Sequence, residues 1–296
     1  MTDLDPRLGS QVDVSLTLSV HRRGGGDPTF RYADGAVWRT CLTPDGPGTI
    51  RVSGLDRAQA WGPGGQWLLD SLPGQLGAAD TGAIPATAPV LGEIARRVPG
   101  LRIGRTERVF EALVPAILEQ KVVSKEAHRA WRTLLFEFGT PAPGPAPAGL
   151  RVFPPPSVWA RIPSWAWHRA GVEGVRARTI INAALVAGRL EQIVTLSHAE
   201  ADQRLRSLPG IGPWTSAEVR QRACGDPDAI SVGDYNLPKV VSWTLAGRRD
   251  ADDELMLELL APYQGQRYRA QRLIEVGGSA PPRHGPRMSV RDYRSI

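Results

Sequence analysis

The stretch that most constrains the fold is Leu208-Pro209-Gly210-Ile211-Gly212-Pro213-Trp214-Thr215. Upstream, Ser197 and Glu200 form a Ser-x-x-Glu capping box, which predicts the start of a helix that the following Pro-Gly pair ends. The two glycines permit a tight reversal with positive φ, and the second proline suits the first turn of another helix running to about Cys224. The stretch therefore predicts two helices joined by a tight hairpin.

This hairpin has the properties of a phosphate-binding site. Glycines carry no Cβ that would keep a ligand away, and backbone amides beside a helix N-terminus favour an anion. A Gly-x-Gly sequence is equally typical of a simple turn between helices, so the pattern alone leaves both interpretations open. The candidate residues for binding a DNA backbone are Leu208, Gly210, Ile211, Gly212 and Thr215.

One of the carboxylates after the hairpin, Asp234, stands at a notable position. Asp234 comes after the small-residue bend Ser231-Val232-Gly233 and precedes a helix that we expect over residues 235–246. Asp is a common helix N-cap, which is the structural interpretation. The functional interpretation is that this carboxylate faces a nucleotide held by the hairpin.

Together these segments resemble the helix-hairpin-helix DNA glycosylase superfamily. LPGIGPWT and the later DPDAISVGDY resemble its signature, and the Trp after the hairpin and the Asp-Tyr pair are most similar to the 3-methyladenine DNA glycosylase II branch, which acts on alkylated bases. FEALVPAILEQ, residues 110–120, resembles the segment before the strand-intercalating loop of that family. The resemblance covers residues 85–275 well and the first 80 more loosely. It implies a mainly α fold, with a small N-terminal antiparallel sheet domain packed on an all-helical domain.

The resemblance also implies roles for individual residues. Asp234 would be the catalytic carboxylate that stabilises an oxocarbenium-like sugar and orients water. Trp214 and Tyr235 would line the pocket for an everted, cationic base through cation–π attraction. Glu218 departs from the family pattern, because a relative has an aromatic residue there. Its carboxylate either attracts a cationic base or is merely solvated.

Two further positions bear on how DNA is handled. Bifunctional members of the superfamily carry a lysine at the position of Trp214, where it forms a Schiff base. The resemblance therefore implies a monofunctional enzyme that leaves the abasic site uncut. Gln120 and Lys121 fall where the family inserts residues into the gap left by the everted nucleotide. Relatives have an apolar wedge at the position of Lys121, so its role as wedge, as phosphate contact or as an ordinary exposed lysine stays open.

Composition narrows the partners and the cofactors. The chain has 36 Lys and Arg against 30 Asp and Glu, a net charge of +6 that fits a polyanionic partner. Its two cysteines cannot supply a four-cysteine iron–sulfur cluster and its five histidines show no metal spacing, so we expect no cofactor and no catalytic metal. There is no apolar signal-peptide core and no run of 18 apolar residues, so we expect a soluble, cytoplasmic, bacterial-type protein without membrane contact. The expected form is a monomer, associated with the nucleoid through double-stranded DNA that contains damaged bases.

Periodicity predicts the division of the chain. Alternation predicts a strand over 12–20, and two further strands are expected over 36–42 and 49–52 on either side of a Pro/Gly-rich turn. These strands predict a sheet-containing domain over 1–82. Helical spacing then predicts a helix-hairpin-helix domain over 83–276, with a proline-rich loop at 140–149. A basic tail, 277–296, ends the chain and could lie along DNA or be disordered. The tryptophans expected in the core are Trp38, Trp61, Trp67, Trp159, Trp165 and Trp167. The helices expected outside the hairpin and residues 235–246 lie over 91–98, 107–120, 124–138, 175–188, 252–260 and 267–275.

Three functions are compatible with these features. The first is hydrolytic excision of alkylated bases of the 3-methyladenine type, in base excision repair. The second is a catalytically silent helix-hairpin-helix protein that binds DNA, which would require neither Asp234 nor Trp214. The third is a glycosylase for a different damaged base.

Overall fold

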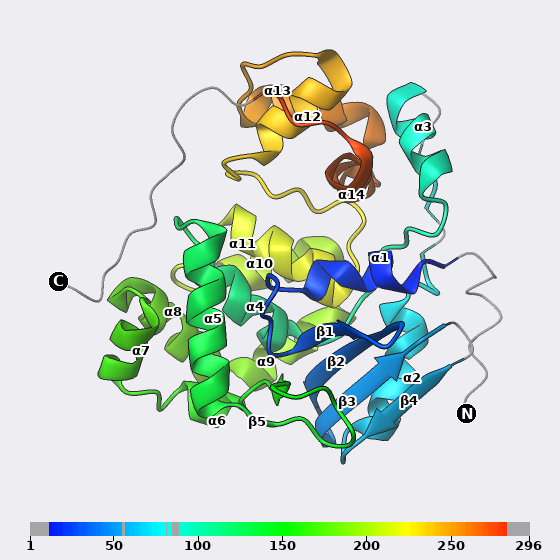
Figure 1. Ribbon diagram of the computed structural model, residues 1–296. Helices are drawn as coiled ribbons and strands as arrows, with labels where there is room; N and C mark the ends of the chain where they lie inside the picture. The colour runs from blue at the N-terminus through cyan, green and yellow to red at the C-terminus, as the bar shows by residue number, and fades with distance from the viewer. Residues whose placement is uncertain (1–11, 55–56, 81, 85–88, 283–296) are drawn as a thin grey trace.

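A computed structural model describes residues 12–54, 57–80, 82–84 and 89–282 (Figure 1). The predicted tail is described only as far as residue 282, and the rest of it lies outside the described residues. The described residues form three larger hydrophobic cores. One lies within an N-terminal sheet unit, one within a central helical unit and one within a C-terminal helical unit. None of the described helices is long and apolar enough to cross a membrane.

The sheet unit contains a four-stranded antiparallel sheet in the order β1-β2-β3-β4. The strands are β1 Phe30–Ala33, β2 Ala36–Thr43, β3 Gly46–Val52 and β4 Ala58–Trp61. β2 and β3 confirm the strands predicted over 36–42 and 49–52. β1 and β2 are joined by Asp34-Gly35, both with positive φ, which matches the right-handed twist of the paired strands. One face of the sheet packs on α2 Gly65–Gln75 through Leu68 and Leu72.

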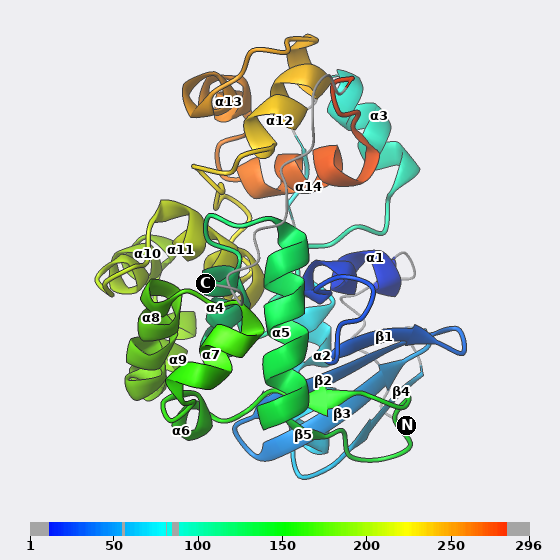
Figure 2. The ribbon, with the colours of Figure 1, turned by 60° about the vertical axis from the view of Figure 1, so that its left-hand side comes forward.

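The strand predicted over 12–20 is wrong. The segment forms α1 Val14–Leu18 followed by a 3₁₀ turn, η2 Ser19–His21. The Asp13 side chain accepts a hydrogen bond from the Leu16 amide (2.8 Å) and so caps the first turn. In the helical turn Leu18 enters the sheet core and Leu16 packs on the C-terminal core. In a strand, residues two positions apart lie on the same face, so both leucines would enter one core. In both views α1 lies between the sheet and the C-terminal helices (Figures 1 and 2).

The central unit is built around α4 Val109–Leu118, in which every residue except Glu111 is apolar and buried. α5 Ser124–Phe138 has the bounds that its periodicity predicts. The other helices of the unit are α6 Pro156–Trp159, α7 Ser164–Ala170, α8 Gly174–Leu185, α9 Ala187–Glu191, η3 Gln192–Thr195, α10 His198–Arg206, α11 Pro213–Val219 and the π-helical η4 Arg220–Cys224. The proline-rich loop is closed at its base by a short pairing of β5 Thr140–Pro141 with β6 Arg151–Val152.

The tryptophan predictions are partly confirmed. Trp38, Trp159 and Trp167 are buried in hydrophobic clusters, whereas Trp61 and Trp67 are half-buried at the edges of such clusters. Trp165 was expected in the core and is 57% exposed. α7 buries the face that carries Ala166, Trp167 and Ala170, and a residue one position before Ala166 points away from that face.

The C-terminal unit joins one helix from early in the chain to the last three (Figure 2). α3 Pro89–Arg97 packs with α12 Leu237–Ala246, α13 Asp253–Leu260 and α14 Arg267–Gly277, and η5 Ala261–Tyr263 lies between the last two. α3, α13 and α14 confirm the helices predicted over 91–98, 252–260 and 267–275. The predicted domain limits at 82 and 276 stay predictions, but the part of the chain between them contains two separate cores.

Candidate active site

The helix-hairpin-helix has the predicted local structure. The Ser197 hydroxyl accepts a hydrogen bond from the Glu200 amide, and the Glu200 carboxylate accepts one from the Ser197 amide, which is the reciprocal capping box at the start of α10. Gly210 has a φ of +89°, and a Cβ at this position would lie 2.5 Å from Oγ1 of Thr179 in α8. Only glycine therefore fits this point of the hairpin. Gly212 differs, because no atom lies within 4 Å of the place that its Cβ would occupy.

The hairpin presents backbone donors on a surface anchored by apolar side chains. Ile211 is buried and Leu208 is half-buried, both against the central core, and the Ile211 amide donates to the Leu208 carbonyl oxygen (3.1 Å). The amides of Gly210 and Gly212 have no acceptor among the described residues. Thr215 is buried in the first turn of α11. Unpaired amides are what an anion site requires, and the role of these hairpin residues in binding a DNA backbone stays a prediction.

Gln120 and Lys121 lie beside this hairpin, in the turn between α4 and α5. The Gln120 side-chain amide donates to the carbonyl oxygen of Gly210 (2.9 Å) and to Oγ1 of Thr215 (2.8 Å). Its side chain therefore ties the turn to the hairpin. Lys121 is exposed and has a φ of +55°, a conformation that is unfavourable for a residue with a Cβ. The strained residue at the tip of the turn is thus Lys121, and its wedge or phosphate role stays a prediction.

Asp234 is held in place by three N–H donors. Oδ1 accepts hydrogen bonds from the amides of Asn236 (2.8 Å) and Leu237 (2.9 Å), and Oδ2 accepts one from the indole N–H of Trp214 (3.2 Å). α12 begins at Leu237, two residues later than the predicted start, so Asp234 contacts the helix start from just outside it. The half-buried carboxylate thus joins the hairpin helix α11 to the start of α12.

The structure gives the predicted base-pocket residues unequal surroundings. Trp214 is half-buried and directly bonded to Asp234. Tyr235 is 67% exposed, and the Lys239 ammonium lies 3.6 Å from the centroid of its ring. One face of this ring therefore already carries a cation, which leaves only the other face for a cationic base. The roles of Trp214 and Tyr235 in binding a base stay predictions.

Glu218 is buried, so the interpretation that it is merely solvated is wrong. One carboxylate oxygen accepts a hydrogen bond from the Ser231 hydroxyl (2.7 Å), and the other forms an ion pair with Arg222 (2.8 Å). Burial raises the pKa of this carboxyl, and Arg222 and Ser231 act in the opposite direction. Both oxygens are occupied by protein partners, so its attraction for a cationic base stays a prediction.

Sequence reasoning missed the residues that fix the chain leading to Asp234. The Gln221 side-chain amide donates to the Ala229 carbonyl oxygen and to Oγ of Ser231 (both 3.0 Å). Gln221 follows Glu218 by three positions, so both reach Ser231 from the same side of the helix. That spacing was an available signal, but it gained meaning only when Ser231 was seen opposite it.

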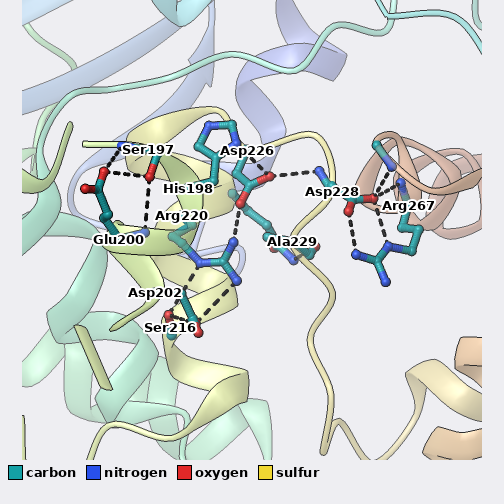
Figure 3. Close-up of polar contacts among 12 residues, drawn as sticks. Ser197, His198, Glu200, Asp202, Ser216, Arg220, Asp226, Asp228, Ala229 and Arg267 are labelled. Carbon is teal, nitrogen blue, oxygen red and sulfur yellow. Dashed lines mark hydrogen bonds and ion pairs between the residues drawn. The ribbon is translucent and has the colours of Figure 1, made fainter. Parts of the chain in front are cut away.

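A second polar network holds the beginning of the same segment (Figure 3). Arg220 pairs with buried Asp226 and with Asp202 of α10, and the Asp226 carboxylate also accepts a hydrogen bond from the Asp228 amide (2.9 Å). Asp228 in turn accepts from the amide and the guanidinium of Arg267 at the start of α14. The segment that carries Asp234 is therefore fastened to the hairpin helices on one side and to the C-terminal unit on the other.

The described residues contain no group of three or more His, Cys, Asp and Glu side chains that could hold a metal ion. The two cysteines, Cys41 and Cys224, are free thiols.

Comparisons with known proteins place the chain beside DNA repair glycosylases. No protein-family model matches the chain. Over 153 residues it is 35% identical to the probable bifunctional transcriptional activator/DNA repair enzyme AlkA of Mycobacterium tuberculosis, covering 50% of this chain and 30% of that protein. It is 26% identical over 180 residues to the DNA-3-methyladenine glycosylase of Bacillus subtilis, covering 60% of this chain and 59% of that one. The chain thus spans less than two thirds of the length of either relative.

Solved structures show the same fold over nearly the whole chain. The 3-methyladenine DNA-glycosylase of Archaeoglobus fulgidus superposes with a TM-score of 0.73 at 17% identity, covering 93% of this chain and 97% of that one. An 8-oxoguanine glycosylase/lyase of Clostridium acetobutylicum, in complex with double-stranded DNA, superposes with a TM-score of 0.69 at 14% identity, covering 90% and 91%. The fold is that of the helix-hairpin-helix glycosylases, and the predicted resemblance to the 3-methyladenine glycosylase branch is confirmed.

Proposed function

We propose that this protein is a monofunctional DNA glycosylase that everts alkylated bases of the 3-methyladenine type from duplex DNA and excises them by hydrolysis, in base excision repair. The observation that carries the proposal is the bond between Asp234 and Trp214. This hydrogen bond connects the hairpin helix directly to the half-buried carboxylate. A protein that only binds backbone phosphates requires no such carboxylate. The similarity to a DNA repair enzyme and to a DNA-3-methyladenine glycosylase supports the same activity.

The chemistry follows from the charge of the substrate. A base alkylated on a ring nitrogen is already cationic and leaves as a neutral molecule, so no general acid is needed. Positive charge then develops on the sugar, where a carboxylate stabilises it and orients the attacking water. Asp234 is fixed by its three donors before any substrate binds, and such preorganisation is what makes electrostatic stabilisation effective.

The partner that fits the surface is duplex DNA. The unpaired amides of Gly210 and Gly212 are suited to phosphate oxygens, and Lys121 adds an exposed cation on the adjoining turn.

The affinity for undamaged duplex is expected to fall as the salt concentration rises, with a linear plot of log affinity against log salt, because phosphate contacts release counterions. Titrations at a series of salt concentrations measure the slope. A slope near zero would contradict backbone recognition by this surface.

The positions of the lysines support the proposed absence of lyase activity. The chain contains three lysines, Lys121, Lys125 and Lys239, and none lies on α11. The tryptophan at position 214 cannot form a Schiff base. Lys239 is on α12, and its ammonium lies over the Tyr235 ring.

The experiment that tests the proposal is base release from methylated duplex DNA, followed by analysis of strand breaks with and without hot alkali. We expect free 3-methyladenine and breaks that appear only after alkali. Borohydride is added in parallel, because it traps a Schiff base covalently. A trapped complex that disappears in Lys239→Arg would overturn the monofunctional assignment. DNA binding without release of any base would favour the silent binding protein, and release of only other damaged bases would favour a different glycosylase.

A further inference from the structure

The turn before Asp234 is held from two sides. The Asp234 amide donates to the Ser231 carbonyl oxygen (3.2 Å), and the Ser231 side chain is hydrogen-bonded to Glu218 of α11 and Gln221 of η4. Gly233 lies inside this turn with a φ of +92°. On the opposite side its amide donates to Oδ2 of Asp253, the first residue of α13 (2.9 Å).

We propose that Asp253 is a positioning residue for Asp234, acting through the amide of Gly233. This role rests on the proposed function of Asp234. Rotation of the peptide group before Gly233 would swing the following residue, because a glycine has the widest choice of φ and ψ. The bond to Asp253 fixes that peptide group, and the amides of Asn236 and Leu237 fix the carboxylate beyond it. The C-terminal unit thereby helps to set where the carboxylate faces the substrate.

The two carboxylate oxygens of Asp253 have different surroundings. Oδ1 is buried and has no hydrogen-bond partner in the part of the chain that the structure describes. A buried acceptor without a partner is unfavourable, and more so when it carries charge. The contact that Asp253 does make is the one with Gly233. An asparagine could make the same contact with its carbonyl oxygen while removing the buried charge.

The neighbouring residue supplies a matched control. Asp252 is the N-cap of α13, and its Oδ1 accepts a hydrogen bond from the Leu255 amide (2.9 Å). Asp252→Ala removes one carboxylate from the same helix start, as Asp253→Ala does, but it leaves the bond to Gly233 intact. Loss of stability at the start of α13 is common to both variants. Only Asp253→Ala releases the turn before Asp234.

The test compares Asp253→Ala, Asp253→Asn and Asp252→Ala with wild type by two measurements. The first is single-turnover base release at saturating enzyme, well below the melting temperature. The second is the indole N–H resonance of Trp214, assigned with Trp214→Phe, which reports the bond to Asp234 without any reaction. We expect Asp253→Ala to slow release by about 10- to 100-fold and to shift the indole resonance, since small misplacements of a catalytic group have effects of that order. Asp253→Asn should stay close to wild type, and Asp252→Ala should lower only the melting temperature.

Three results would overturn the inference. They are a wild-type rate with an unmoved indole resonance in Asp253→Ala, an equal loss in Asp252→Ala, and an Asp253→Asn variant as slow as Asp253→Ala. The last would mean that the charge matters rather than the hydrogen bond. Failure of the proposed function is distinguished by the wild type itself, which would then release no base. In that case a shifted indole resonance in Asp253→Ala would still support the positioning role, and an unmoved one would refute it.

Discussion

Asp234→Asn is expected to slow the release of alkylated bases by about 10²- to 10³-fold, the usual effect of removing one electrostatic stabiliser of a transition state. Asparagine keeps the size of the side chain but not its charge, so the developing oxocarbenium loses its counter-charge. It also conflicts with the surroundings. If the carbonyl oxygen accepts from the amides of Asn236 and Leu237, the amide N–H₂ faces the indole N–H of Trp214, and two donors then oppose each other.

Trp214→Phe separates these two effects. Phenylalanine retains an aromatic ring but removes the indole N–H, so it breaks the bond to Asp234 while the carboxylate keeps its charge. We expect a smaller loss than for Asp234→Asn, about tenfold, because one hydrogen bond to a charged group contributes about 1.5–3 kcal/mol and a half-buried bond of 3.2 Å falls at the lower end of that range. Single-turnover rates of both variants on the same methylated duplex give the comparison. Binding to a duplex that contains a stable abasic-site analogue serves as the folding control.

The rates of these two variants distinguish a catalytic role of Asp234 from a purely structural one. If Asp234→Asn binds the analogue as wild type does but releases almost no base, the carboxylate acts in the chemical step. If it releases base at close to the wild-type rate, Asp234 is only the structural cap that the sequence also allows, and the proposed mechanism is wrong. A Trp214→Phe variant slower than Asp234→Asn would show that the ring, rather than its N–H, is the essential group.

Features that are determined by neighbouring residues could be predicted from the sequence, whereas features that depend on tertiary contacts could not. The hairpin was predictable because its signals are local: a capping box, a glycine with positive φ and a proline in the first helical turn. The strand expected over 12–20 failed because its alternation satisfies one face of a sheet, whereas Leu16 and Leu18 in fact enter two different cores. Only the tertiary arrangement distinguishes these outcomes.

The residues of the candidate site also differ in how far the sequence predicts them. Asp234 and Trp214 belong to motifs whose spacing carries a family resemblance, and the structure brings them into contact. Burial of Glu218 was not predictable, because its partner Ser231 is 13 residues away and on the far side of a turn. Asp253 gave still less signal. An Asp-Asp pair before a helix is typical of a capped start, and nothing local tells which of the two turns back toward Gly233.

Substitution by alanine is expected to lower the folding stability at Gly210 but not at Gly212. In Gly210→Ala the new Cβ would lie 2.5 Å from Thr179 Oγ1, at a φ of +89° that alanine rarely adopts. We expect a loss of about 1–3 kcal/mol of folding free energy, the usual cost of such a conformation. Gly212→Ala meets no atom within 4 Å and has a φ of −95°, so it should leave the melting temperature nearly unchanged.

In Gly212→Ala we expect DNA binding to be affected although stability is not. The Gly212 amide is unpaired among the described residues and the space beside it is open, so a Cβ there would meet an approaching phosphate instead of protein. We expect Gly212→Ala to weaken binding of undamaged duplex about tenfold, the loss of roughly one good hydrogen bond. Melting curves and salt-matched binding isotherms of the two variants make the test. If Gly212→Ala binds DNA as wild type does, the open side of the hairpin is not where the backbone lies, because no other change in that variant could compensate for the displaced phosphate.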